Sequence, residues 1–429
     1  MNLLIIPILA LALTLLIMEA AWACEGRFIA VTDVIPDAVL DIRYAGENNF
    51  VGEPIDGYRA PVAILSLEAA LSLRNAADSL RRQGYAIKIF DAYRPASAVA
   101  HFVRWGRDLS DLRKKSLFYP DTDKSLLFKK GYIATRSGHS RGGTVDLTIV
   151  RTATGEEVDM GSPFDYFGDI SHMSSPLVSG AQAENRKILK SAMERAGFKA
   201  LRTEWWHFTM KNEPYKNTHF DFPVDYPQAS DGAAASELDR VSGGAAKIMT
   251  AFPASGQNAT DKTAAIIRVY EKTEIGWILK FETKGFFGKS GVRDDKREGD
   301  GATPSGVYSF GRAFGVAEDP GARAPYTRAS DGDVWVDDPN SRFYNTWQSD
   351  NNPDKDWKSA ERITKYPEQY KYAIAINYNS ENPIPGRGSA IFLHCSTGGP
   401  TAGCVSVPEA DMIYLLSFID GGTKIFIKN

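Results

Sequence analysis

A short polar segment divides this chain into two unlike halves, and this division constrains the fold more than any other feature. Residues 228–236 are small and polar and lack hydrophobic periodicity, which predicts a linker over 225–245. Helix and strand patterns mix before the segment, whereas short strands separated by glycine-rich turns follow it. With 429 residues and no internal repeat, the chain is expected to hold two different domains.

The first half has the periodicities of an α+β domain. Apolar residues recur every three or four positions after Ser66, a candidate N-cap, and the pattern ends before Gly84. The alternation that follows Gly84 is typical of a strand. The predicted elements are a helix over 67–83, a strand over 85–90, a helix over 184–196 and a strand near 202–210. The second half is expected to be mostly β.

Composition indicates globular domains and excludes some partners. Apolar residues make up 43% of the chain and charged residues 24%, which is enough apolar material for hydrophobic cores. The formal net charge of -3 provides no basic footprint, so we expect no nucleic-acid partner. Three cysteines are too few for a disulfide-built scaffold.

The N-terminus carries the pattern of an export signal. Residues 3–18 are almost uninterrupted apolar sequence, and Ala21-Trp22-Ala23 supplies the small-x-small pattern of a cleavage site. We expect a signal peptide over 1–23 and an exported protein of the cell envelope or the extracellular space. An uncleaved membrane anchor and lipidation at Cys24 remain alternatives, and both also place the chain outside the cytoplasm. Membrane contact is expected only through such an N-terminus.

Two segments of the first half supply the ligand types of a zinc hydrolase. His139 and Asp146 lie in one segment and His207 in the other, giving two imidazole nitrogens and a carboxylate oxygen. Glu204, three residues before His207, is the candidate base, which would take a proton from water and pass it to the leaving amine. Arg94 follows the first strand and could stabilise the oxyanion, because guanidinium stays charged.

Each of these features has an ordinary explanation when taken alone. A histidine and an aspartate at this spacing are common, and an arginine at a strand end is usually solvated. Trp205 and Trp206 are expected in the core or in a pocket wall. His101, His172 and His219 have no motif around them, so we expect ordinary surface or hydrogen-bonded histidines.

The combination of motifs is more specific than its parts. The pattern Ser137-x-His139-x6-Asp146, then Glu204-x-x-His207, with Asp91-Ala-Tyr-Arg94-Pro upstream, resembles the zinc D-alanyl-D-alanine dipeptidases. The resemblance covers most of residues 27–223. Further matches are Asp41-Ile-Arg-Tyr-Ala45, Asn49-Phe50 and Asp159-Met-Gly-Ser-Pro-Phe-Asp165.

The resemblance implies a role for each motif residue. His139, Asp146 and His207 would hold one zinc ion per chain. Glu204 would be the catalytic acid and base, and Arg94 the stabiliser of the transition state. D-Ala-D-Ala is the implied substrate. Ser137 is a candidate for binding its amino end, although a serine before a ligand can equally orient that ligand.

The second half ends with a candidate cysteine nucleophile. Cys404 follows Gly403, which permits a tight turn, and a strand over 391–393 delivers His394. A cysteine near an imidazole can be activated as thiolate, and backbone N–H groups of the turn could form an oxyanion hole. Two alternatives stay open on the residues alone: a disulfide between Cys395 and Cys404, or two buried thiols.

This stretch resembles the catalytic domain of L,D-transpeptidases, which carries a histidine followed by Ser/Thr-x-Gly-Cys. Here His394 is followed by Thr401-Ala-Gly-Cys404. The likeness covers about residues 246–429 and implies Cys404 as nucleophile with His394 as its proton partner. The interval of ten residues from His394 to Cys404 is short for the family, and Cys395 is an unexpected neighbour. Further matches are Gly299-Asp-Gly-Ala-Thr-Pro-Ser-Gly306-Val-Tyr308, Trp335-Val-Asp-Asp338 and Tyr344-Asn345.

Both resemblances point to cell-wall peptides. By the second, the thiolate attacks the L-to-D bond of a tetrapeptide stem, and an amine resolves the resulting thioester. The leading hypothesis is an exported bifunctional enzyme whose partners are D-Ala-D-Ala and peptidoglycan stem peptides. One alternative makes the zinc half a D,D-carboxypeptidase that trims stem peptides for the transpeptidase. In another, one domain is inactive and serves as a cell-wall binding module.

Overall fold

The computed structural model describes residues 27–429 apart from 228, 231 and 255–261. The chain divides into two compact units, residues 1–228 and 229–429. The predicted signal peptide and Cys24 lie outside the described residues. Within the described part of the chain, no helix combines the length and the apolar character that crossing a membrane requires.

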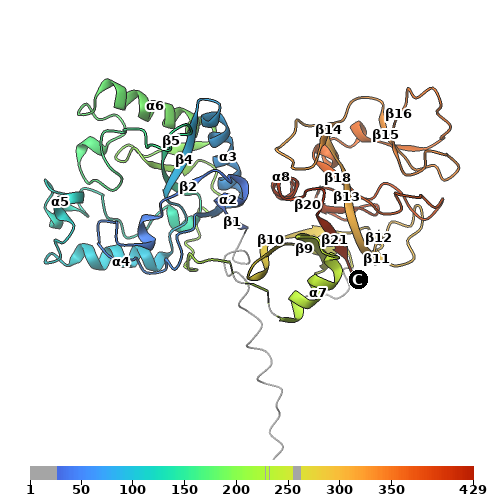
Figure 1. Ribbon diagram of the computed structural model, residues 1–429, viewed down its shortest axis with the longest axis horizontal. Coiled ribbons are helices and arrows are strands. Elements are labelled where there is room, and N and C mark those ends of the chain that lie inside the picture. The colour runs from blue at the N-terminus through green and yellow to red at the C-terminus, as the bar shows by residue number, and fades with distance from the viewer. Residues whose placement is uncertain (1–26, 228, 231, 255–261) are drawn as a thin grey trace, which may run out of the picture. The chain divides into compact units, whose positions relative to one another are not determined.

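A five-stranded sheet forms the centre of the first unit (Figure 1). Its strand order is β2-β4-β5-β7-β6, and β2 and β4 are the parallel pair. Outside this sheet, β1 (Phe28–Ala30) pairs with β3 (Ile64–Ser66). The strands of the sheet are β2 (Val39–Leu40), β4 (Tyr85–Asp91), β5 (Thr144–Arg151), β6 (Phe198–Ala200) and β7 (His207–Met210).

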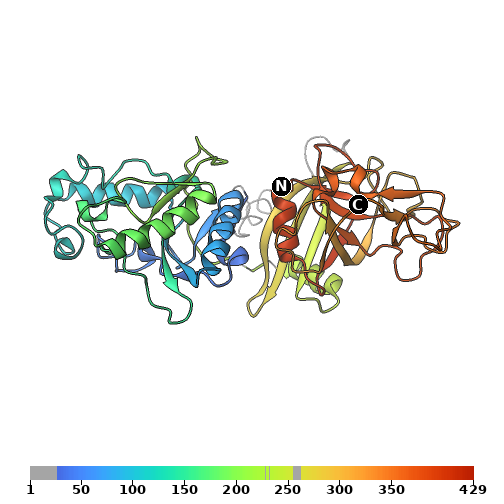
Figure 2. The same ribbon diagram turned by 90° about the horizontal axis from the view of Figure 1, so that it is seen from above.

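Two long helices pack against this sheet. Helices α3 (Leu67–Arg81) and α6 (Gly180–Arg195) contact each other, and they contact β4 and β6 respectively (Figure 2). The buried leucines of α3 recur at helical spacing, and each contributes roughly 1.5–3 kcal/mol of transfer free energy. The other helices and 3-10 turns are α2 (Val31–Val34), α4 (Ala96–Arg107), α5 (Lys115–Phe118), η1 (Arg43–Ala45), η2 (Lys124–Leu126), η3 (His139–Arg141) and η4 (Asp169–Ser171).

The α+β class expected for the first half is confirmed, with differences at the element ends. Helix α3 begins after Ser66 as predicted, but the Ser66 side chain makes no capping hydrogen bond. Helix α6 begins four residues before the predicted start, because Ser179 and Gln182 form a reciprocal capping box. Of the strand predicted near 202–210, only His207–Met210 is extended, as β7.

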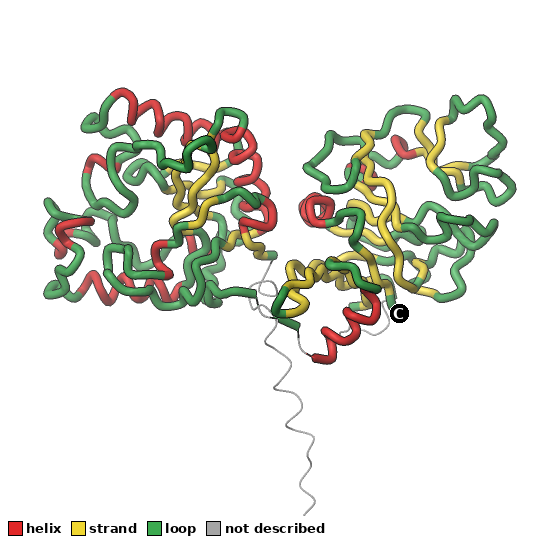
Figure 3. Tube along the Cα trace, viewed as in Figure 1, coloured by secondary structure: helices red, strands yellow, loops and turns green. Residues whose placement is uncertain are grey.

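The second unit is built on a nine-stranded sheet that closes on itself. Its order is β14-β13-β18-β19-β20-β10-β9-β8-β21, and β13 also pairs with β21, so the sheet is barrel-like. Strands and loops dominate this unit, which confirms the mostly β prediction (Figure 3). The strands are β8 (Lys247–Pro253), β9 (Ala264–Thr273), β10 (Gly276–Phe286), β13 (Gly306–Gly315), β14 (Tyr326–Arg328), β18 (Ala373–Ile376), β19 (Phe392–Cys395), β20 (Val405–Val407) and β21 (Lys424–Ile427).

Smaller elements decorate the barrel. Helix α8 (Glu409–Phe418) follows Pro408. A three-stranded sheet has the order β16-β15-β17, and a two-stranded sheet pairs β11 with β12. These elements and the turns beside them are β11 (Val292–Arg293), β12 (Thr303–Pro304), β15 (Asp333–Val336), β16 (Trp347–Ser349), β17 (Ala360–Arg362), η5 (Ile363–Lys365) and η6 (Gln369–Lys371).

The linker predicted over 225–245 is where the structure differs most from the sequence analysis. Residues Gly232–Ser242 form helix α7, which contacts β8 and β10. Leu238 and Val241 are buried by this contact. The helix signal consists of these two apolar residues after a run of alanines, which is too short for periodicity to reveal a helix.

Candidate active sites

Strand register brings two of the predicted zinc ligands of the first unit, Asp146 and His207, together. Strands β5 and β7 are antiparallel, and Asp146 lies directly opposite His207. Asp91, at the end of β4, lies opposite Asp146 on the other side. Directly opposed residues share one face of a sheet with Cβ atoms about 4.5–5.5 Å apart, so the ladder itself aligns these side chains.

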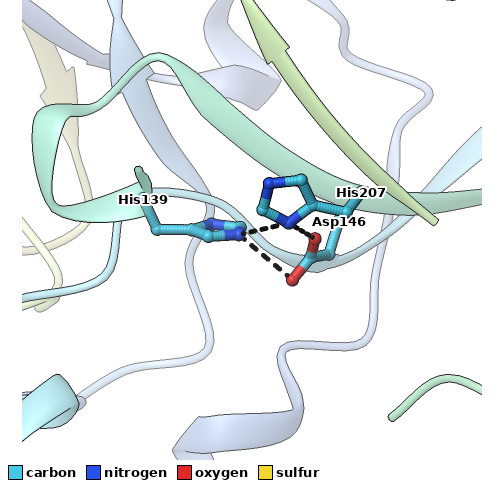
Figure 4. Close-up of side chains that lie close together, drawn as sticks. All are labelled: His139, Asp146 and His207. Carbon is cyan, nitrogen blue, oxygen red and sulfur yellow. Dashed lines mark hydrogen bonds and ion pairs between the residues drawn. The ribbon is translucent and has the colours of Figure 1, made fainter. Parts of the chain in front are cut away.

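The three predicted zinc ligands form one compact cluster (Figure 4). His139 begins η3, and its Nε2 lies 3.3 Å from both His207 Nδ1 and Asp146 Oδ2. His207 Nδ1 lies 3.0 Å from Asp146 Oδ1. One ligand atom from each residue falls within 4.8 Å of the other two. The cluster therefore presents two nitrogens and an oxygen at one point.

The groups around the cluster fit a metal ion. His139 Nδ1 lies 2.6 Å from the carbonyl oxygen of Ala92, which fixes Nε2 as the ligand atom. Apart from its close approach to His207 Nδ1, Asp146 Oδ1 is buried without a hydrogen-bond partner among the described residues. Burial disfavours the charge of Asp146, but the His139 and His207 imidazoles hold its pKa below the usual range. This donor set of two imidazoles and one carboxylate suits zinc.

Glu204 lies beside the cluster without belonging to it. Its Oε2 is 3.7 Å from His207 Nδ1, in the turn that leads into β7. Burial raises the pKa of Glu204 to about 7, which favours a carboxyl group that both accepts and donates a proton near neutrality. The predicted base is therefore within reach of a group at the metal position.

Arg94 lies against the same cluster with 13% of its side chain exposed, and its charge is already compensated. Its Nε donates to Asp91 at 2.8 Å, and its Nη2 donates to Asp146 at 3.3 Å. The guanidinium also stacks over the ring of Tyr44, 5.0 Å from its centroid. These contacts fix the position of the guanidinium next to a ligand of the cluster, which suits the predicted oxyanion role.

Ser137 lies at the edge of the cluster. Its Oγ accepts a hydrogen bond from the backbone N–H of His139 at 3.2 Å, which suits the orienting alternative. Ser137 also lines a cavity of about 490 Å³ that includes Arg136, Lys216 and His219. Cations line this cavity, so a carboxylate suits that face of Ser137 better than an amino group does.

Asp165 is a buried acid for which the sequence predicted no role beyond membership of the matching motif over 159–165. Its backbone has φ 62°, a conformation that non-glycine residues rarely adopt. Tyr44 donates a hydrogen bond to its Oδ2 at 3.0 Å. Burial, with Asp146 nearby, raises the pKa of Asp165 well above its usual range. Strain and a buried acid mark functional sites, but neither is visible in the sequence.

In the second unit, Cys404 and His394 line one cavity of about 370 Å³. The Cys404 Sγ donates to the carbonyl of Ala390 and accepts from the N–H of Phe392, each at 3.3 Å. His394 Nδ1 lies 2.8 Å from the carbonyl of Cys395, which leaves Nε2 as the free acceptor. Within the described residues, no hydrogen bond joins the Cys404 and His394 side chains.

Burial controls the protonation of this pair. It raises the pKa of the Cys404 thiol far above its usual range and lowers the pKa of His394 to about 4. The resting pair is therefore a neutral thiol and a neutral imidazole. Cys395 and Cys404 are both free and buried, so the disulfide alternative is wrong. Cys404 also lines the cavity, which leaves its prediction as nucleophile in place.

Thr401 organises the turn that carries the thiol. Its Oγ1 donates to the carbonyl of Cys404 at 2.7 Å and accepts from the N–H of Gly403 at 3.1 Å. The Gly403 amide is therefore occupied and is not available to an oxyanion. Gly403 has φ 149°, and a Cβ there would lie 2.9 Å from the carbonyl oxygen of Ala302, so only glycine fits.

Comparisons with known proteins match both units. Residues 25–225 match the family model described as D-ala-D-ala dipeptidase, and residues 260–427 match the L,D-transpeptidase catalytic domain. A D-alanyl-D-alanine dipeptidase of Enterococcus faecium is 40% identical over 200 residues, covering 47% of this chain and 99% of that protein. A D-alanyl-D-alanine dipeptidase of Escherichia coli is 30% identical over 177 residues, which cover 41% of this chain and 81% of that protein.

A solved structure of a vancomycin-resistance D,D-pentapeptidase with Zn(II) shares 14% identity and a TM-score of 0.23. The alignment covers 36% of this chain and 77% of the chain in that structure. At this TM-score, the likeness supports no conclusion about this chain.

The fold and the two sites define an enzyme with a metallopeptidase unit and a cysteine acyltransferase unit. Through its first unit the chain belongs to the D-alanyl-D-alanine dipeptidase family. Its second unit matches the model of an L,D-transpeptidase catalytic domain over residues 260–427.

Proposed function

We propose that the chain is an exported bifunctional peptidoglycan enzyme with one zinc ion. The first unit hydrolyses D-Ala-D-Ala, and the second transfers acyl groups between stem peptides through Cys404. The cluster of His139, Asp146 and His207 carries the first half of this proposal, because its atoms converge within 4.8 Å. This chain is similar to a dipeptidase along 99% of the length of that protein, and this likeness supports the proposed substrate.

The surroundings of the cluster suit hydrolysis of a peptide bond. His139, Asp146 and His207 would hold the ion, and zinc supplies Lewis acidity toward the scissile carbonyl when bound. Glu204 accepts a proton from the attacking water and donates it to the leaving amine. The Arg94 guanidinium, held by Asp91 and Asp146, faces the oxygen that gains charge.

A comparison of two substrates tests the peptidase proposal. The full chain should release D-alanine from free D-Ala-D-Ala, and Glu204→Gln should abolish this release while zinc content by mass spectrometry stays unchanged. Cleavage of a stem pentapeptide in place of the dipeptide would instead favour the D,D-carboxypeptidase alternative. Retained turnover in Glu204→Gln would remove Glu204 from the mechanism.

The second unit is suited to acyl transfer through a thioester. As the Cys404 sulfur attacks the carbonyl of an L-to-D bond, His394 Nε2 takes the thiol proton and then donates it to the leaving amine. The Cys395 carbonyl holds the imidazole in the tautomer that this step needs. Incubation with disaccharide tetrapeptide should add one acyl mass to the wild-type chain and none to Cys404→Ala.

Export completes the proposal, since peptidoglycan lies outside the cytoplasmic membrane. We propose a signal peptide over 1–23, and membrane contact only if that segment stays uncleaved or Cys24 is lipidated. N-terminal sequencing of the protein from its native envelope tests this. A chain that begins at Cys24 without lipid supports cleavage, and a cytoplasmic full-length chain contradicts export.

A further inference from the structure

Glu361 is a half-buried acid in the thiol cavity, and the mechanism above does not use it. It lies on β17 and lines the same cavity of about 370 Å³ as Cys404 and His394. Among the described residues Glu361 has no ion-pair partner, and the Tyr370 hydroxyl is the hydrogen-bond donor to its carboxylate.

Tyr370 connects this acid to the catalytic imidazole. The Tyr370 ring packs edge-on against the ring of His394, with centroids 5.5 Å apart and an interplanar angle of 86°. Both aromatic residues are buried, so the arrangement is fixed by packing. Glu361, Tyr370 and His394 therefore form one contiguous wall beside the thiol.

The charges facing Glu361 are mostly negative. Glu298 and Asp337 line the same cavity, and Glu298 accepts hydrogen bonds from Tyr344 and Ser389. The lining cation is Lys296, whose Nζ is held by Asp300 at 2.7 Å. Burial, with Asp337 and Glu298 adding to it, raises the pKa of Glu361 to about 7.

Resolution of the thioester requires a group that accepts a proton from the acceptor amine, and His394 is poorly suited to this role. An amine acceptor is protonated at neutral pH and must lose a proton before it can attack. Burial lowers the pKa of His394 to about 4, which makes its imidazole a weak acceptor for a proton from an ammonium group. A carboxylate that titrates near neutrality is better matched to this step.

We propose that Glu361 is the base that deprotonates the acceptor ammonium group when the thioester is resolved. This rests on the proposed transpeptidase function. The ammonium gives one proton to the Glu361 carboxylate, and the free amine attacks the thioester carbonyl. The C–N bond forms as the C–S bond breaks. The second amine proton passes through His394 to the Cys404 sulfur, and Glu361 then releases its proton to solvent.

Two acceptors of different charge test this role in the full chain. Wild type, Glu361→Gln and Asp337→Asn are first acylated with disaccharide tetrapeptide, and thioester formation is followed by intact mass. Glycine, an ammonium at neutral pH, and hydroxylamine, which is largely uncharged there, are then added in turn. Asp337→Asn removes a negative charge from the same cavity wall and controls for general attraction of cations.

We expect Glu361→Gln to form the thioester at the wild-type rate and to lose about tenfold or more of its aminolysis by glycine. Hydroxylamine should resolve the thioester equally fast in both proteins. Asp337→Asn removes only a secondary contribution to the raised pKa of Glu361, so it should lose much less of its aminolysis by glycine than Glu361→Gln. Equal glycine rates in wild type and Glu361→Gln would overturn the proposal, as would equal losses with both acceptors or the same loss in Asp337→Asn. Failure of the wild type to form any thioester would instead overturn the transpeptidase function itself.

Discussion

At the scale of single residues, the thiol of Cys404 is held in its neutral form. Burial raises its pKa, and the nearby imidazole of His394 has a lowered pKa, so neither group favours a resting thiolate–imidazolium pair. The sequence predicted the nucleophile and its partner but expected an activated thiolate. Burial of both groups in the barrel wall depends on tertiary packing, and the motif does not encode it.

This state predicts how alkylation of Cys404 depends on pH. Because the thiol pKa is raised, the thiolate fraction should keep increasing from pH 6 to pH 9, by about tenfold per unit. The rate of iodoacetamide labelling, read by peptide mass with Cys404→Ala as the background, measures this dependence. A rate that is flat between pH 6 and pH 8 would indicate a preformed ion pair and contradict the prediction.

Asp146 is the ligand whose loss is easiest to interpret. Asp146→Asn keeps the size of the side chain but removes the charge that the two imidazoles and the metal require. Dipeptidase activity and zinc content, measured by inductively coupled plasma mass spectrometry, should fall by more than the roughly 10–100-fold typical of an outer-shell change. Undiminished zinc would exclude Asp146 as a ligand. Surface Asp159→Asn is the matched control.

Among single residues, the sequence predicted the side chains that form the candidate zinc site, but it did not predict Glu361 in the thiol cavity. His139, Asp146, His207 and Glu204 were predicted from their ligand types and from the resemblance that their combined motifs carry, and the structure brings them together. Glu361 could not be found, because it reaches the thiol cavity from a strand more than thirty positions earlier in the chain and lies in no motif.

At the scale of elements, helix α7 is the element whose hydrophobic periodicity was too weak for the sequence to predict it. Its polar, alanine-rich sequence predicted a linker, yet Leu238 and Val241 are buried against the barrel. Longer periodic elements such as α3 and β4 were predicted nearly to their ends. Periodicity therefore works where a face has several apolar positions and fails where two residues anchor the element.

A substitution in α7 tests its structural role. Leu238→Ala should lower the free energy of unfolding of the second unit by about 2–4 kcal/mol, because it leaves a cavity over β8 and β10. Urea denaturation with hydrogen exchange of those strands as the local probe measures this change. Exposed Ser236→Ala in the same helix should change stability by less than about 0.5 kcal/mol. A neutral Leu238→Ala would show that the helix docks loosely.

At the scale of the whole molecule, each unit contains its own core and its own site. The first unit holds the cluster of candidate zinc ligands and the barrel holds the thiol, and the two sets of residues do not overlap. The sequence predicted this division because the halves differ in periodicity. The division after residue 228 falls within the predicted linker over 225–245, but the sequence did not predict that part of this segment forms helix α7 of the second unit.

Separate sites predict independent loss of activity. Cys404→Ala should remove thioester formation and leave D-Ala-D-Ala hydrolysis within about twofold of wild type, and Glu204→Gln should do the reverse. Both activities are measured on the full chain, with the double variant as the reference for complete loss. A large fall of hydrolysis in Cys404→Ala would show that the units depend on each other.

The pairing of Asp146 with His207 has a consequence for the variation that the chain can tolerate. Side chains alternate between the two faces of a sheet, so one added or deleted codon within either strand would turn one ligand toward the opposite face. Hydrophobic content would hardly change, and the domain could still collapse. Insertions and deletions in this strand pair should therefore be rarer among natural relatives than in the surrounding turns.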